Sequence, residues 1–161
     1  MENALKKGLG FGVSSAVIAT LAIIVGMHAG VDLKHAIISA VLVIAFADSL
    51  ADSLAVHFSE KGDEKVSAKD AWVTTLTAFV TKLVFALTFL IPIFIFNLHI
   101  AIWIDIIYGF IILVVYSFQL AKSKNEGIVK TITLHILLAA GVILASHAIG
   151  LFINHFFGST P

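Results

Sequence analysis

The chain has 161 residues, of which 60% are hydrophobic and 12% are charged, and its mean hydropathy is +1.06. A water-soluble domain of this length covers its surface with charged side chains, and ten basic and ten acidic residues gathered in a few short stretches cannot do so. Lipid must cover most of the chain, which predicts an integral membrane protein.

The formal net charge is zero, and all ten basic residues are lysines. The chain therefore has no basic surface with which to bind nucleic acid, and nucleic acid is excluded as a partner. Cysteine is absent, which excludes disulfides, thiolate catalysis and iron–sulfur ligation. We expect neither an enzyme nor a permanently bound cofactor.

Five long apolar runs predict five transmembrane helices, because about 20 apolar residues cross the hydrocarbon core and only helices or closed barrels satisfy their backbone there. The first run has the length of a full span, so we expect it to be retained rather than cleaved as a signal peptide. Pro92 lies near the end of the third run, where a kink or fraying of the helix is tolerated if neighbouring groups take up the freed carbonyl. The predicted fold is a single all-α transmembrane domain with spans at residues 8–30, 36–58, 71–97, 99–121 and 128–157.

The distribution of lysines predicts the orientation of these spans. With the N-terminus in the cytoplasm, eight loop lysines lie on the cytoplasmic side and only Lys34 lies outside. Such an excess is the positive-inside signal, and an odd number of spans then places the C-terminus outside. The eight are Lys6, Lys7, Lys61, Lys65, Lys69, Lys122, Lys124 and Lys130.

The second span carries two carboxylates at membrane depth, where each ionised group costs about 2.5–3.5 kcal/mol on insertion scales. Asp48 and Asp52 are four residues apart, and each is followed directly by a serine. At 100° per residue, the aspartates share one helix face with Ser59, and a neighbouring face carries Ser49, Ser53 and Glu60, with His57 at the edge. The span is therefore amphipathic inside the bilayer.

Carboxylate, hydroxyl and imidazole groups are ligands for hard or borderline divalent cations, which makes this face a candidate metal site. The candidate ligands are Asp48, Asp52, His57 and Glu60. The alternative is that the aspartates are neutralised by protonation or by Lys82 of the third span, in a structural ion pair. The two readings are compatible, because a lysine that competes with a cation for the same carboxylates can act as a proton-coupled gate.

Further polar residues are candidates for a pathway through the membrane. Serines and threonines of this kind also pack helices together or bond to their own backbone, and acidic loop residues are also simply solvated. Asp105, early in the fourth span, fits either a path residue or a solvated helix end. The candidate pathway or gating residues are Ser14, Ser15, Ser49, Ser53, Thr81 and Lys82, and Asp63 and Glu64 are the candidate cytoplasmic mouth.

The residues from Gly12 to Gly26, followed by a second span that ends in His57-Phe58-Ser59-Glu60-Lys61, resemble the vacuolar iron transporter family and its short prokaryotic relatives. The resemblance implies a homodimer in a prokaryotic cell membrane rather than an organelle membrane. It also implies export of ferrous iron or manganese from the cytoplasm in exchange for protons. The chain departs from the family pattern in reading Ser14-Ser15-Ala16 where members usually have an acidic residue followed by glycine.

The leading functional hypothesis is accordingly a divalent-metal transporter with Fe2+ or Mn2+ as its substrate. Its partners are membrane lipid, the metal ion and a second copy of the chain. The alternative is a non-transporting membrane scaffold or sensor of the same architecture, in which Lys82 holds the aspartates permanently.

Overall fold

The computed structural model describes residues 1–158, which are almost entirely helical and contain no β-strand. Five helical stretches are long and apolar enough to cross a membrane: Glu2–Gly30, Lys34–Lys61, Ala68–Ile95, Leu98–Lys124 and Ile128–Phe157. The prediction of an all-helical protein with five membrane-spanning segments is therefore confirmed. The individual helices are α1 (Glu2–Gly30), α2 (Lys34–Val43), the π-helical turn η1 (Ile44–Asp48), α3 (Ser49–Lys61), α4 (Ala68–Thr88), α5 (Leu90–Ile95), α6 (Leu98–Lys124) and α7 (Ile128–Phe157).

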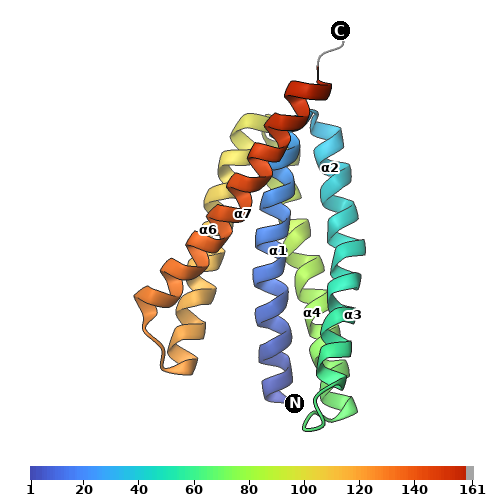
Figure 1. Cartoon of the computed structure of the whole chain (residues 1–161), viewed down its shortest axis with the longest axis vertical. Helices are drawn as coiled ribbons and strands as arrows, with labels where there is room; N and C mark the ends of the chain where they lie inside the picture. The colour runs from blue at the N-terminus through green and yellow to red at the C-terminus, as the bar shows by residue number, and fades with distance from the viewer. Residues whose placement is uncertain (159–161) are drawn as a thin grey trace.

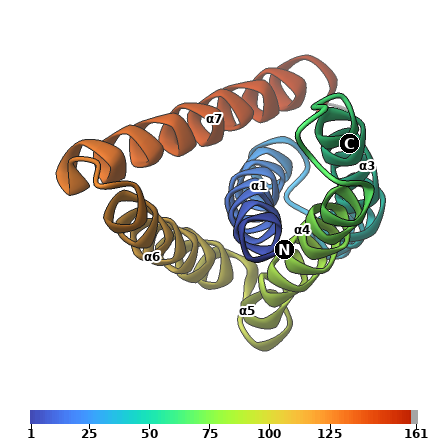
Figure 2. The ribbon, with the colours of Figure 1, turned by 90° about the horizontal axis from the view of Figure 1, so that it is seen from below.

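The first helix is the centre of the bundle. Figure 2 shows α1 surrounded by α3, α4, α5, α6 and α7, and α1 is the span with the largest buried share. Figure 1 shows Met1 and the connector after α3 at one end of the bundle, and the C-terminal end of α7 at the other. We call these ends the N-side and the C-side.

Glycines allow α1 to contact its neighbours at backbone distance. A Cβ added to Gly12 would lie 2.7 Å from Thr81 Cβ, and one added to Gly8 would lie 2.6 Å from the Thr74 carbonyl oxygen, both on α4. On the C-side, a Cβ on Gly150 of α7 would lie 2.2 Å from the carbonyl oxygen of Gly26. Small residues of this kind are how transmembrane helices pack closely. They fix α1 tightly against α4.

The third predicted span, placed at about residues 71–97, corresponds to the helical stretch Ala68–Ile95. The span ends at Ile95, and Asn97 instead begins α6, where its side-chain oxygen accepts a 3.1 Å hydrogen bond from the Ile100 amide. Asn at this position satisfies a backbone N–H that the first helical turn leaves free. The third span is broken before Pro92: α4 ends at Thr88, the residue whose carbonyl a proline four positions later cannot bond.

The second span is interrupted by a π-helical turn at Ile44–Asp48. Such turns insert one residue into an α-helix, rotate the two halves relative to each other, and often occur at functional sites. Here the turn ends on Asp48, one of the four predicted metal ligands. The second span therefore deviates from a regular α-helix at the first of its two aspartates.

Candidate functional site

A buried lysine bridges the two carboxylates of the second span. Lys82 Nζ donates to Asp48 Oδ2 and to Asp52 Oδ2, each at 2.5 Å. The Lys82 side chain is 1% exposed, whereas those of Asp48 and Asp52 are 40% and 33% exposed. The sequence left open which aspartate the lysine would meet, and the structure shows that it meets both.

A third helix contributes to the same group of side chains. Ser15 of α1 donates a 2.7 Å hydrogen bond to Asp52 Oδ2, the oxygen that also accepts from Lys82. This contact is possible because Gly12, one turn away on α1, lets that helix lie directly on Thr81, the neighbour of Lys82. We call Asp48, Asp52 and Lys82 the charged triad. With all three groups ionised, its formal charge is −1, because two carboxylates face one ammonium group.

His57, a predicted metal ligand, belongs to a different face of α3. Its ring is buried, lies 3.0 Å through Nδ1 from Thr75 Oγ1 of α4, and stands 4.3 Å from the indole ring of Trp72 between ring centroids. Thr75 donates its own hydroxyl proton to the Ala71 carbonyl at 2.8 Å, so the hydroxyl oxygen accepts and Nδ1 is the protonated nitrogen. The interaction joins α3 to α4.

Glu60, the fourth predicted ligand, pairs with Lys7 of α1 at 3.2 Å on the N-side. The structure thus brings together only Asp48 and Asp52 of the four predicted ligands. Within residues 1–158, no three His, Cys, Asp or Glu side chains lie near enough to one another to hold a metal ion. Within one chain the four candidate ligands therefore do not lie together, because His57 faces α4 and Glu60 lies at the helix end.

The remaining predicted pathway residues have different surroundings. Ser14 donates to the Gly10 carbonyl at 2.8 Å, and Ser53 donates to the Leu50 carbonyl at 2.9 Å, so both bond to their own helix. Thr81 packs against Gly12. Ser49 is buried, and its hydroxyl has no hydrogen-bond partner in the described part of the chain. Of these serines and threonines, only Ser15 contacts the charged triad.

The buried residues of α3 lie on the face that carries Ser49 and Ser53. Ser49, Ser53 and His57 recur every four residues and are buried, whereas the aspartates lie beside them at the edge of the packed surface. The aspartates reach Lys82 from this edge. Their outer oxygens remain open on the surface of the single chain.

A pocket of about 450 Å³ lies on the N-side between α1 and α3, with α4 as its floor. It approaches the charged triad, because Val56 lies one turn from Asp52 on α3 and Phe11 lies one turn from Ser15 on α1. The predicted mouth residues Asp63 and Glu64 are exposed in the connector after α3, beyond the pocket. The lining residues are Lys7, Phe11, Ala55, Val56, Ser59, Glu60 and Thr74.

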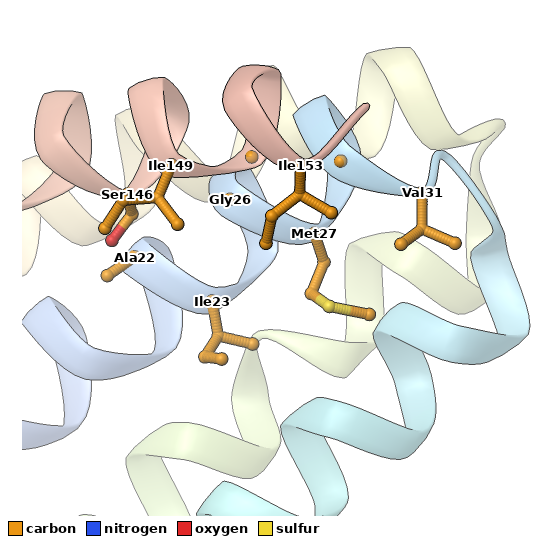
Figure 3. A pocket seen from close by; sticks show the side chains of 10 residues that line it. Ala22, Ile23, Gly26, Met27, Val31, Ser146, Ile149 and Ile153 are labelled. Carbon is orange, nitrogen blue, oxygen red and sulfur yellow. The ribbon is translucent and has the colours of Figure 1, made fainter. Parts of the chain in front are cut away.

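Another pocket, of about 240 Å³, lies on the C-side between α1 and α7 (Figure 3). Ile23 and Met27 of α1 and Ile149 and Ile153 of α7 surround it, and Ser146 supplies the one labelled side-chain oxygen. Its lining is aliphatic and contains no charged group, so it suits hydrocarbon rather than an ion.

The sequence did not point to the partners that fix these groups. Lys7 as the partner of Glu60 and Thr75 as the partner of His57 lie 53 and 18 residues away along the chain. Charge complementarity could have suggested Lys7, because both residues lie near cytoplasmic helix ends in the predicted topology. Thr75 carried no separate signal.

Comparison with family models, with curated proteins and with solved structures gives no match for this chain.

Proposed function

We propose that the protein transports a divalent cation across the membrane and that the cation binds at Asp48 and Asp52 in competition with Lys82. The observation that carries this proposal is the geometry of the charged triad: two partly exposed carboxylates share one buried ammonium group. Their formal charge of −1 at membrane depth calls for one further positive charge, which a proton or a metal ion can supply.

Lys82 gives a physical basis for exchange between the metal and protons. A divalent cation that binds both carboxylates displaces the ammonium group from at least one of them. The displaced lysine is 1% exposed and has its pairing removed, which favours release of a proton from it or movement of the helix that carries it. Binding of metal and binding of protons are then coupled through the same two carboxylates.

The N-side pocket supports a route to the triad. Its lining includes Lys7 and Glu60 near the helix ends and Val56, which lies one turn from Asp52 on α3. With the lysine-rich N-side in the cytoplasm, the route leads outward from the cytoplasm. The direction of transport proposed here is therefore export.

The chemistry of the ligands and the family resemblance select the ion. Oxygen ligands without cysteine favour Fe2+ or Mn2+ over copper. The partly exposed aspartates give a second copy of the chain a surface on which to complete the coordination, which supports a homodimer. The proposed setting is a prokaryotic cell membrane.

A second candidate function is a non-transporting scaffold or sensor, in which the triad is permanently closed. The observation that favours it is the direct 2.5 Å contact of Lys82 with both aspartates, since such a pair also neutralises charge without any transported ion.

Uptake of Mn2+ or Fe2+ into proteoliposomes, followed together with internal pH, separates these two functions. We expect wild type to accumulate metal, Asp52→Asn to lose that uptake, and Glu2→Gln to retain it because the Glu2 side chain is exposed and pairs only with Lys6 among the described residues. Lys82→Met is expected to bind metal without proton movement. Equal, background-level uptake by wild type and Asp52→Asn would exclude transport and leave the scaffold.

A further inference from the structure

Asp105 of α6 is a buried carboxylate outside the charged triad. It is 0% exposed, and neither of its carboxylate oxygens has a hydrogen-bond partner among residues 1–158. It lies on the face of α6 that packs on α1, one turn from Gly109, whose added Cβ would touch Leu21 and Val17. The sequence allowed a solvated helix end at this position, and the burial of Asp105 excludes that reading.

An ionised carboxylate in such surroundings has neither a hydrogen-bond donor nor a counter-ion to stabilise its charge. Transfer of an unpaired charge into an apolar interior is so costly that the group becomes neutral instead. The helices packed most closely on α6 are α1, α5 and α7, and Tyr108 of α6 also donates a hydrogen bond to Thr88 at the end of α4. Helix α5 has no titratable side chain. The titratable residues in the C-side halves of α1, α6 and α7 are His28, His99, Tyr108, His147 and His155, and none forms a hydrogen bond or ion pair with Asp105.

A second unpartnered polar group lies on α1, the helix that contacts both α6 and the charged triad. The Thr20 hydroxyl of α1 is fully buried and, within the described chain, has no hydrogen-bond partner. Thr20 follows Ser15, the residue bonded to Asp52, by five positions, and it precedes Leu21, which packs on Gly109 of α6. A hydroxyl can accept and donate a proton, so Thr20 is suited to relay one between the two acidic sites.

We propose that Asp105 is a second proton-binding site, neutral in this conformation, which takes a proton from the C-side and supplies it to the charged triad. Asp105 lies seven residues into α6, roughly 10 Å from its C-side end. The proton binds a carboxylate oxygen of Asp105 from water and later passes toward Asp48 or Asp52, which restores the carboxylate. The supply of protons rests on the proposed exchange function, whereas proton binding by Asp105 does not.

Infrared spectroscopy of the purified protein in lipid tests proton binding without reference to transport. We expect wild type to show the carbonyl stretch of a protonated carboxylic acid near neutral pH. Asp105→Asn is expected to lose it and Asp105→Glu to shift it, while Asp63→Asn, altered in the exposed connector, retains it. A spectrum that does not change in Asp105→Asn or in Asp105→Glu would overturn the proposal. The glutamate variant keeps an acid at this position and serves if the asparagine variant does not fold.

Proteoliposomes test the supply of protons separately. In Asp105→Asn we expect Mn2+ binding, measured by calorimetry, to remain while metal-driven proton movement is lost. Unchanged proton movement would exclude the supply role. If wild type moves no metal at all, the exchange function and the supply role both fail, and the infrared result alone decides whether Asp105 binds a proton.

Discussion

Ser15 and Asp52 are joined by a 2.7 Å hydrogen bond that connects α1 directly to α3. The accepting oxygen also receives the ammonium group of Lys82 from α4, so three helices meet at a single atom. A change in the charge of that oxygen, or in its hydrogen-bond partners, therefore affects the contacts among all three helices.

Neutralising the aspartates one at a time should affect stability far less than neutralising both. Asp48→Asn or Asp52→Asn leaves Lys82 one carboxylate, and because the aspartates are partly exposed, we expect each single change to cost about 1 kcal/mol or less. The double variant leaves a buried ammonium group unpaired, which costs about 3–5 kcal/mol. Unfolding in detergent micelles gives the three values. Adding Lys82→Met to the double variant should restore most of the lost stability. If the loss in the double variant equals the sum of the two single losses, the two aspartates do not share Lys82 as a partner.

Gly12→Val should separate α1 from α4. The new Cβ would lie 2.7 Å from Thr81 Cβ and 2.9 Å from the Ala78 carbonyl oxygen, and overpacking of this kind typically costs about 1–3 kcal/mol. Gly141→Val on α7 is the matched control, because nothing lies within 4 Å of its added Cβ. Thermal unfolding of both variants in the same lipid or detergent measures the difference. Similar melting temperatures for the two would show that α1 and α4 do not pack at backbone distance.

Thr75→Val should destabilise the contact between α3 and α4. The variant keeps the shape of the side chain but removes the hydroxyl that accepts from His57, and a buried donor left without a partner costs about 1–3 kcal/mol. Thr75→Ser retains the hydroxyl and should be close to wild type. Nitrogen-15 NMR of wild type should show the proton on Nδ1 of His57, and a proton on Nε2 alone would contradict the assigned hydrogen bond.

Asn97→Ala should weaken the start of α6. The side chain accepts from the Ile100 amide, and loss of such a cap costs about 0.5–2 kcal/mol. Asn97→Asp keeps an accepting oxygen and serves as the control. Hydrogen exchange at the Ile100 amide should quicken only in the alanine variant, and equal exchange in both variants would argue that residue 97 does not cap the helix.

The five spans could be predicted because the hydrocarbon core requires long apolar runs, and the fifth span agrees with the predicted residues 128–157. The boundary near residue 97 could not be predicted by hydropathy, which does not register a capping hydrogen bond. Pro92 marked the break in the third span, since the loss of its N–H acts locally.

The candidate site was predicted in part, because the hydrocarbon core also constrains where charged side chains can lie. Buried charge must be compensated, so Asp48, Asp52 and Lys82 could be associated from sequence. The π-turn at Ile44–Asp48 could not be predicted, because a regular helix of 100° per residue contains no such turn. The separate surroundings of His57 and Glu60 depend on contacts with Thr75 and Lys7 that lie far away along the chain.

The depth of the charged triad gives it an electrical property. Asp52 is nine residues from the Lys61 end of a 28-residue span, which places it about a third of the way along the helix. An elementary charge that reaches this point from the N-side crosses part of the transmembrane voltage, which is worth about 2.3 kcal/mol per 100 mV for the full thickness. Occupancy of the aspartates by any ion that enters along this path therefore depends on membrane potential as well as on concentration, and a divalent ion feels that dependence twice as strongly as a proton.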